Sequence, residues 1–402
     1  MNERIKFCLE WQRRWDEAEG GRVDVAELCR VFGVSRQRGY VWLRRFREAG
    51  FDARALEDRS RRPHTSPTAI SEPMQDMVVW ARKRHPRWGP RKLRAWLVRL
   101  YPAREFPSAT AMASILKRHG LTAVRRQRRR RQAPAPAEPF GPATAPNSVW
   151  CIDFKGKFKT GDGEWCTPFT ITDAYSRFCI RCELVEEPDA LAVEHILDSA
   201  FREFGLPAAI RSDNGPPFAA QGPAGLTKLA VWLLRLGLRL ERITPGRPQE
   251  NGRHERFHRT LADAVTSPAR ANARAQQRAL DLFRREYNEE RPHEALGQLP
   301  PADLYTASSR RYPCGLLPPT GSSFGHIERV DQHGAIRWHR KRLFISTALC
   351  GAYIQLEPDA GTRWAVLFGS ILLGHIDGAK PATGLLAMPR RRKSHVLQLQ
   401  RA

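Results

Sequence analysis

Residues 149–154 read VWCIDF, and this run decides how the middle of the chain folds. It is short, apolar and rich in aromatic and β-branched residues, which is typical of a strand. Similar runs at 165–172 and 177–185 follow after short polar connections. Beyond them the sequence predicts alternating elements: helix 189–204, strand 208–211, helix 224–236, strand 238–242 and a helix from 251. This order predicts a mixed α/β sheet with helices on its faces.

Three acidic residues stand out by their positions in this pattern. Asp153 lies inside the first strand, where a carboxylate is costly unless it is satisfied. Asp213 follows the strand 208–211, and Glu255 lies in the first turns of the helix from 251. Carboxylates converging in this way suit two magnesium ions about 3.5–4 Å apart. Each has an ordinary alternative when taken singly, since Asp-Asn-Gly is a common turn and a helical surface Glu is usually solvated.

Several motifs occur in a fixed order across this region. They are WCID (150–153), ITDAYSR (171–177), SDNG (212–215), PQENGRHER (248–256), YNEERPH (287–293) and PA (301–302). Together they closely resemble the integrase core of the D-D-E transposases, a group within the retroviral-integrase superfamily. The resemblance is to its branch of bacterial insertion-sequence transposases. It covers roughly residues 148–305, and the ordered set is far more specific than any one motif.

The resemblance implies a ribonuclease-H-like catalytic core over 148–306 that binds two Mg²⁺ or Mn²⁺ ions. Asp153 would bridge both ions, while Asp213 and Glu255 would each hold one. The implied activity is metal-dependent cleavage at the 3′ end of a mobile element, followed by strand transfer. Arg259, one turn after Glu255, would hold a phosphate or be a solvated surface side chain. Two alternatives stay open: a catalytically silent DNA-binding regulator derived from a transposase, and a nuclease of the same fold.

The charge of the chain is distributed unevenly. The formal net charge is +25, which points to a polyanionic partner, either nucleic acid or an anionic membrane surface. Residues 1–132 carry 32 Lys and Arg against 14 Asp and Glu, whereas residues 150–310 carry 22 of each kind. No run of eighteen apolar residues indicates a membrane span. We therefore expect a cytoplasmic, nucleoid-associated protein that binds double-stranded DNA, both element ends and target, as a homo-oligomer.

Residues 1–60 carry the pattern of a helix-turn-helix DNA-binding domain. Asp24 begins a first helix, Gly33 allows a sharp turn, and Ser35 caps a second helix that runs to about residue 48. The start of the second helix exposes three polar side chains suited to the major groove, namely Arg36, Gln37 and Arg38. The alternative is an ordinary basic pair of amphipathic helices.

Two further basic segments and a second helical module follow. Arg61 and Arg62 lie in a Pro-rich linker that either enters a minor groove or is merely solvated. Residues 68–122 are predicted to form a second helical DNA-binding domain, with Trp80 among its core residues. Residues 123–147 form a basic, Pro-rich linker whose arginines would contact phosphates, among them Arg128, Arg129 and Arg130.

Short strands with frequent turns return at 322–378 and predict a small β-barrel. The last segment, 379–402, is expected to be a disordered basic tail. The overall fold class is therefore multidomain: helix-turn-helix modules, an α/β core and a C-terminal barrel. The eight cysteines are scattered and predict reduced, buried thiols, with zinc at Cys179 and Cys182 as the alternative.

Overall fold

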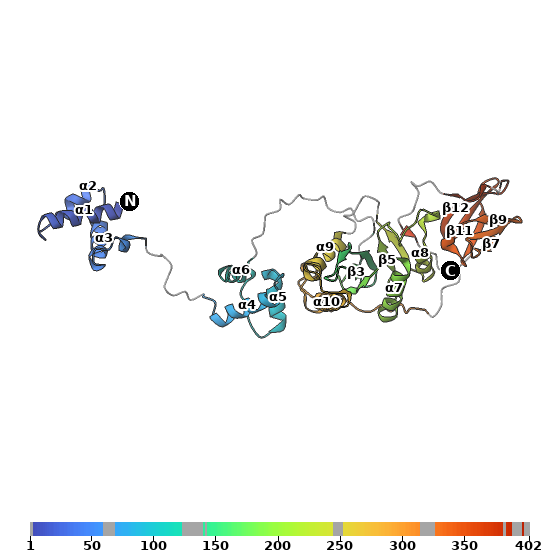
Figure 1. Cartoon of the computed structure of the whole chain (residues 1–402), viewed down its shortest axis with the longest axis horizontal. Helices are drawn as coiled ribbons and strands as arrows, with labels where there is room; N and C mark the ends of the chain where they lie inside the picture. The colour runs from blue at the N-terminus through green and yellow to red at the C-terminus, as the bar shows by residue number, and fades with distance from the viewer. Residues whose placement is uncertain are drawn as a thin grey trace. The chain divides into compact units, whose positions relative to one another are not determined.

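The computed structural model describes residues 3–58, 69–122, 140, 143–243, 252–313, 326–380, 383–387 and 396–397. The chain forms two compact units, residues 1–69 and 70–402, and Figure 1 shows the elements of each. Among the described helices, none combines the length and the apolar character needed to cross a bilayer.

The first unit is a small helical domain made of α1 (Glu3–Glu17), α2 (Val25–Val31), α3 (Arg36–Glu48) and the 3₁₀ turn η1 (Ala53–Leu56). The predicted caps are confirmed, because Asp24 accepts from the backbone N–H groups of Ala26 and Glu27, and Ser35 accepts from that of Arg38. Helix α1 was not predicted. Most of its residues are charged, so the sequence shows no clear apolar pattern. Only three of its residues are buried in the core: Phe7, Cys8 and Trp11.

Gly39 marks the close approach between the three helices of this unit. A Cβ atom at this position would lie 2.6 Å from Cys29 Sγ and 3.0 Å from Phe7 Cζ. The helix therefore gives up the propensity of an Ala at this point, about 1 kcal/mol, so that its backbone can approach α1 and α2. A glycine that looks unfavourable within the helix is thus explained by packing.

The second helical module consists of α4 (Glu72–Arg84), α5 (Pro90–Leu100) and α6 (Ala109–Arg118). Most of its predicted core is buried: Trp88, Leu93, Trp96, Leu97, Ile115 and Leu116. Trp80 was also predicted to be core, and this was wrong. Its side chain is 44% exposed and stacks on Trp96 from outside, with ring centroids 5.5 Å apart.

The central sheet has seven strands: β1 (Val149–Phe154), β2 (Phe158–Lys159), β3 (Trp165–Asp173), β4 (Cys179–Val185), β5 (Ala209–Ser212), β6 (Arg239–Arg242) and β14 (Val396–Leu397). The strand order is β14-β6-β5-β1-β3-β2, and β4 also pairs with β3. Strands β1, β5 and β6 are parallel, whereas β3 is antiparallel to both β1 and β4. The predicted mixed sheet is confirmed.

Helices cover both faces of this sheet (Figure 1). Helices α7 (Ala190–Phe204) and α8 (Lys228–Arg235) pack on the face that carries Trp150 and Ile152. On the other face lie α9 (Gly252–Leu261), α10 (Ala273–Arg285) and the π-helical turns η4 (Ala262–Thr266) and η5 (Glu286–Glu290). Helix α8 begins four residues later than the predicted 224, because Ala224 and Gly225 adopt positive φ angles in the turn η2 (Pro223–Gly225).

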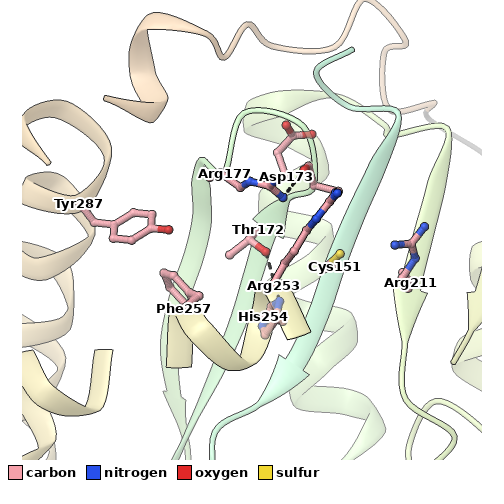
Figure 2. Close-up of a pocket in the computed structure, with 10 residues that line it drawn as sticks. Cys151, Thr172, Asp173, Arg177, Arg211, Arg253, His254, Phe257 and Tyr287 are labelled. Atoms are coloured by element: carbon pink, nitrogen blue, oxygen red, sulfur yellow. Dashed lines mark hydrogen bonds between the residues drawn. The ribbon is translucent and has the colours of Figure 1, made fainter. Parts of the chain in front are cut away.

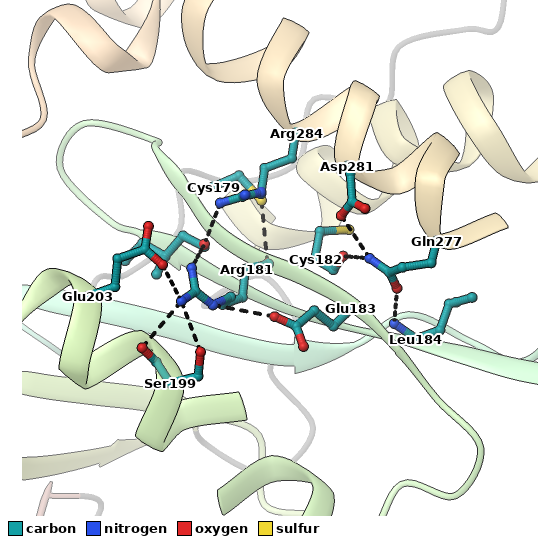
Figure 3. A network of polar contacts seen from close by, with 11 residues as sticks. Cys179, Arg181, Cys182, Glu183, Leu184, Ser199, Glu203, Gln277, Asp281 and Arg284 are labelled. Atoms are coloured by element: carbon teal, nitrogen blue, oxygen red, sulfur yellow. Dashed lines mark hydrogen bonds and ion pairs between the residues drawn. The ribbon is translucent and has the colours of Figure 1, made fainter. Parts of the chain in front are cut away.

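A polar network fixes β4 between the two helical layers (Figure 3). The buried guanidinium of Arg181 forms an ion pair with Glu203 of α7 and another with Glu183, at 3.3 Å. From the opposite layer, Gln277 of α10 receives the Leu184 N–H, and Arg284 donates to the Ile180 carbonyl. Pairing to backbone and side chains on both sides satisfies these buried groups and sets the position of α10.

The cysteines that the structure describes are all free, and six of the seven are buried. This confirms the prediction of reduced, buried thiols. Cys179 and Cys182 belong to the apolar cluster under α9 and α10. Within the described part of the chain, neither belongs to a group of side chains that could hold a metal ion. The zinc alternative therefore has no support.

The C-terminal region consists of short strands, as predicted: β7 (His326–Arg329), β8 (Ala335–Trp338), β9 (Lys341–Phe344), β10 (Tyr353–Pro358), β11 (Arg363–Phe368), β12 (Ile371–Asp377) and β13 (Leu386–Ala387). The predicted closure into a barrel is not found. In the described residues the strands form an open five-stranded antiparallel sheet, β13-β12-β11-β10-β7, and a separate β8–β9 hairpin. Closure needs the first and last strands to pair, which strand spacing does not determine.

The prediction of a disordered basic tail is wrong at two points, the first of which is β13, paired with β12. At the second, Val396 and Leu397 form β14, which pairs antiparallel with the edge strand β6 and buries Leu397. An edge strand offers unpaired backbone groups, so a short apolar segment can add to it even inside a basic stretch. The Arg and Lys at 390–393 lie outside the described residues.

Candidate active site

The register of the parallel strands places two of the predicted carboxylates next to each other. Cys151 of β1 is paired with Arg211 of β5. Asp153 and Asp213 each follow two residues later, at the same level, where β5 has just ended. Neighbouring strands lie about 4.8 Å apart, and residues two apart share a face of the sheet. The fold thus places these two residues at the same level, at the carboxyl ends of neighbouring strands.

Asp213 lies in an environment that disfavours its charge. Burial raises the pKa of its carboxyl above the ordinary value, although the Gly215 N–H donates to Oδ1 at 3.1 Å and works in the opposite direction. A half-buried carboxylate is stabilised by a nearby positive charge. The site is therefore suited to a cation.

The hydroxyl of Thr170 joins β1 to helix α9. Thr170 is the cross-strand neighbour of Asp153, and its hydroxyl donates to the Asp153 carbonyl oxygen at 3.1 Å. The hydroxyl oxygen of Thr170 also lies 2.7 Å from Nε2 of His254 and 2.8 Å from Nε2 of His258. His258 Nδ1 in turn lies 4.0 Å from Oδ2 of Asp153. Among the described residues, Asp153, His254 and His258 form the group whose ligand atoms are close enough to hold one metal ion.

Both imidazoles are held in the neutral form. Burial lowers the pKa of His258 to about 4, with the charge of Lys155 contributing in the same direction. Burial also lowers the pKa of His254 well below its usual range. A neutral imidazole carries one N–H and one lone pair, so each ring can donate at one nitrogen and accept or ligate at the other.

Glu255 lies in the first turn of α9, between these two histidines in sequence, and its side chain is exposed. His254 and His258 hold this helix against the face of the sheet that carries Asp153. The meeting of Glu255 with Asp153 and Asp213 stays a prediction. The residues just before α9, 244–251, lie outside the described part of the chain.

Asp173, an acid of the ITDAYSR motif, has a structural role in the turn after β3. It is buried and accepts the backbone N–H of Asn147 at 2.8 Å. It also accepts both the N–H and the hydroxyl of Ser176, each at 2.7 Å. With its oxygens occupied in this way, Asp173 fixes the entry to β1 and the turn after β3.

A pocket lies on the face of the sheet covered by α9, and two of its lining residues, Cys151 and Arg211, stand two positions before Asp153 and Asp213 (Figure 2). Three arginines contribute to its wall: Arg177, Arg211 and Arg253. Arg211 is neutralised by Glu241, with Nη2 and Oε2 2.7 Å apart. Burial lowers the pKa of Arg177, and the charge of Arg253 lowers it further. The positively charged side chains of Arg177 and Arg253 thus line the same pocket.

Sequence reasoning missed the histidines and these arginines. His254 and His258 are four residues apart, so they share one side of a helix, a spacing that is recognisable in sequence. Their contact with Thr170 was not recognisable, because it joins residues more than eighty positions apart.

The predicted DNA contacts are described only in part. Arg36, Gln37 and Arg38 are exposed at the start of α3, and Arg259 is exposed on α9. The remaining predicted contacts lie outside the described residues: Arg61, Arg62, Arg128, Arg129 and Arg130. Contact of any of these side chains with DNA stays a prediction.

Comparison with known families bears directly on this arrangement. One family model of the integrase core domain matches residues 143–248, another model of the same description matches residues 236–301, and a helix-turn-helix domain matches residues 16–64. An uncharacterised 31.7 kDa protein of the insertion element IS407 from Burkholderia multivorans is 31% identical over 190 residues. The chain belongs to the bacterial insertion-sequence transposases of the retroviral-integrase superfamily.

Other relatives match the chain over different lengths. A 39.2 kDa protein of the insertion element IS476 from Xanthomonas euvesicatoria is 26% identical over 240 residues, and the Gag-Pol polyprotein of baboon endogenous virus is 31% identical over 121. The matches cover 47% and 59% of the chain for the two insertion-element proteins, and 66% of each of those proteins. For the viral polyprotein they cover 30% of the chain and 7% of the polyprotein.

Two solved structures are also similar. A chain of the simian T-cell lymphotropic virus intasome, solved with the PP2A regulatory subunit B56 gamma, is 17% identical with a TM-score of 0.37. The match covers 78% of this chain and 100% of the intasome chain. The HTLV-2 integrase catalytic core domain, solved in complex with magnesium, is 14% identical with a TM-score of 0.29. That match covers 40% of this chain and 96% of the core domain.

Proposed function

We propose that this chain is a DNA transposase that cleaves at the 3′ end of a mobile element and joins the freed 3′-OH to target DNA. The observation that carries the proposal is the shared level of Asp153 and Asp213 at the ends of neighbouring parallel strands. Helix α9, which bears Glu255, packs on the same face through His254 and His258. In this proposal the three carboxylates, each from a separate element, would meet at one end of the sheet.

The donor set fits a magnesium or manganese site. Hard divalent cations prefer carboxylate oxygens, and a nearby positive charge would stabilise the half-buried carboxylate of Asp213. In the proposed arrangement Asp153, Asp213 and Glu255 would hold the ions. Bound ions would lower the pKa of the attacking water or hydroxyl and neutralise charge that develops on the phosphate.

The protein's own residues would position DNA rather than attack it. No covalent intermediate with the protein is required, so no serine or tyrosine nucleophile is assigned. Arg259, one turn after Glu255, would hold a phosphate. The basic segment 1–132 would supply most of the affinity for element ends, with α3 in the major groove. We propose that a homo-oligomer of the chain acts on the element ends and the target.

A strand-transfer assay tests the proposal directly. The full chain is incubated with labelled element ends and target DNA in Mg²⁺, and the cleaved and joined products are separated. We expect both products, and we expect neither in excess chelator. Binding without cleavage would show a silent regulator, and cleavage without joining would show a nuclease. Full activity in chelator would contradict the metal-dependent mechanism.

A further inference from the structure

His258 faces the proposed metal site with one ring nitrogen. The three contacts of the Thr170 hydroxyl fix which nitrogen this is. A hydroxyl has one hydrogen to donate, and the Asp153 carbonyl oxygen can only accept. All three contacts are satisfied together only if Thr170 donates to that carbonyl and accepts from Nε2–H of both His254 and His258. In that arrangement the Nδ1 atom of each ring carries a lone pair.

The two histidines differ in what their Nδ1 atoms meet. Nδ1 of His254 lies 3.2 Å from the hydroxyl of Thr172, which can donate to it. Both nitrogens of His254 are thus engaged in hydrogen bonds. Nδ1 of His258 instead faces a carboxylate oxygen of Asp153 at 4.0 Å. A lone pair and a carboxylate oxygen at this distance form no hydrogen bond with each other.

The distance between these two atoms suits two ligands of one ion. Imidazole nitrogens and carboxylate oxygens bind such ions at about 2.0–2.2 Å, so two ligands of one ion lie at most roughly 4.2 Å apart. The observed 4.0 Å is within this limit. His258 also lies three residues after Glu255 on α9, which places both on the same side of the helix.

We propose that His258 Nδ1 is a ligand of the ion held between Asp153 and Glu255, which makes the donor set of that ion mixed nitrogen and oxygen. The proposal rests on the proposed function, since it assumes that the two carboxylates share an ion. His254 acts as a positioning residue that, through Thr170, holds the same helix. A nitrogen donor favours Mn²⁺ over Mg²⁺, because imidazole suits transition metals better than hard ions.

Pulsed electron paramagnetic resonance on the full chain with Mn²⁺ alone tests this inference. We expect a nitrogen hyperfine coupling on the bound Mn²⁺, which moves to ¹⁵N frequencies when the histidines are labelled with ¹⁵N. His258→Asn removes the coupling and weakens Mn²⁺ binding about 10-fold or more. Thermal unfolding of the variant establishes that it is folded, and the labelled wild-type chain needs no variant at all. His195→Asn, which changes an exposed histidine of α7, serves as the matched control and keeps the coupling.

The possible failures can be told apart. Suppose that Asp153→Asn loses Mn²⁺ binding but the wild type shows no histidine coupling. This result would overturn the role of His258 and leave the proposed function standing. Coupling that survives in folded His258→Asn would have the same meaning. Mn²⁺ binding that Asp153→Asn leaves unchanged would contradict the carboxylate site itself, and with it the proposed function.

Discussion

Strand β1 presents two chemically different faces. Trp150 and Ile152 point to α7 and α8 and are 0% and 1% exposed. Asp153 lies on the opposite face, and the Thr170 hydroxyl donates to its backbone carbonyl under the histidines of α9. Because successive side chains of a strand alternate between faces, six residues contribute to the hydrophobic core and to the proposed chemistry at once.

This difference separates stability from activity. The apolar face contributes to the free energy of unfolding through burial, and the polar face contributes to the chemistry through charge. Substitutions on one face should therefore change one quantity and leave the other nearly unchanged, provided the shape of the side chain is kept.

Asp153→Asn tests the polar face and carries the largest expected effect. It keeps the shape of the side chain and removes its charge, so we expect strand cleavage to fall roughly a thousandfold or more. The free energy of unfolding should change by less than about 1 kcal/mol. Single-turnover cleavage and urea unfolding measure the two quantities. A loss of folding that matches the loss of cleavage would remove the distinction between the faces.

Trp150→Ala tests the apolar face. It creates a cavity against Phe201 and removes the hydrogen bond from Nε1 to Asn147, 2.9 Å long. We expect a loss of about 3–5 kcal/mol in the free energy of unfolding. Trp165→Ala is the control, because this side chain is 55% exposed, and it should cost about 1 kcal/mol or less. Equal losses in both variants would show that the apolar face is not the main source of stability.

Gly39→Ala carries the same test to the first unit. The new methyl group would meet Cys29 Sγ and Phe7, so we expect a loss of about 1–3 kcal/mol despite the better helix propensity of alanine. Adding Cys29→Ala removes the closest contact and should restore part of the loss. Thermal unfolding of the wild type, Gly39→Ala and the double variant measures it, and a stabilised Gly39→Ala would contradict the packing.

The last prediction concerns the contribution of the start of α3 to DNA binding. Arg36→Ala or Arg38→Ala in the full chain should weaken binding to element ends by about 1–3 kcal/mol if the side chain contacts a base edge. Binding to unrelated DNA should weaken less. Titrations at several salt concentrations check this, because the loss of a phosphate contact would weaken binding to all sequences and flatten the salt dependence. An equal loss for both kinds of DNA would assign these residues to phosphates.

Much of the fold could be predicted because local patterns determine it. The run 149–154 became β1 with the predicted bounds, and the capping residues Asp24 and Ser35 begin helices as expected. Periodicity and capping depend on neighbouring residues, which the sequence contains in full. Helix α1 and strand β14 were missed, because in both a few buried side chains stand among many charged ones.

The site could be predicted only as far as its motifs reach. The predicted roles of Asp153, Asp213 and Glu255 as metal ligands came from the family resemblance. The histidines were missed because their partner, Thr170, lies on a strand far away in sequence. Long-range contacts of this kind depend on strand register and on how a helix crosses the sheet, which residue patterns do not fix.

The central claim is that Glu255 completes a metal site with Asp153 and Asp213, and a comparison of Glu255→Gln with Glu250→Gln tests it most directly. Glu250 lies five residues earlier, outside the described residues, and is the matched control. End binding, cleavage and joining are scored separately for both variants, with Asp153→Asn and Asp213→Asn alongside. We expect Glu255→Gln, Asp153→Asn and Asp213→Asn to bind ends but neither cleave nor join them, and we expect Glu250→Gln to remain active. Cleavage lost in Glu250→Gln and kept in Glu255→Gln would move the site, and cleavage kept in Asp153→Asn or Asp213→Asn would contradict the mechanism.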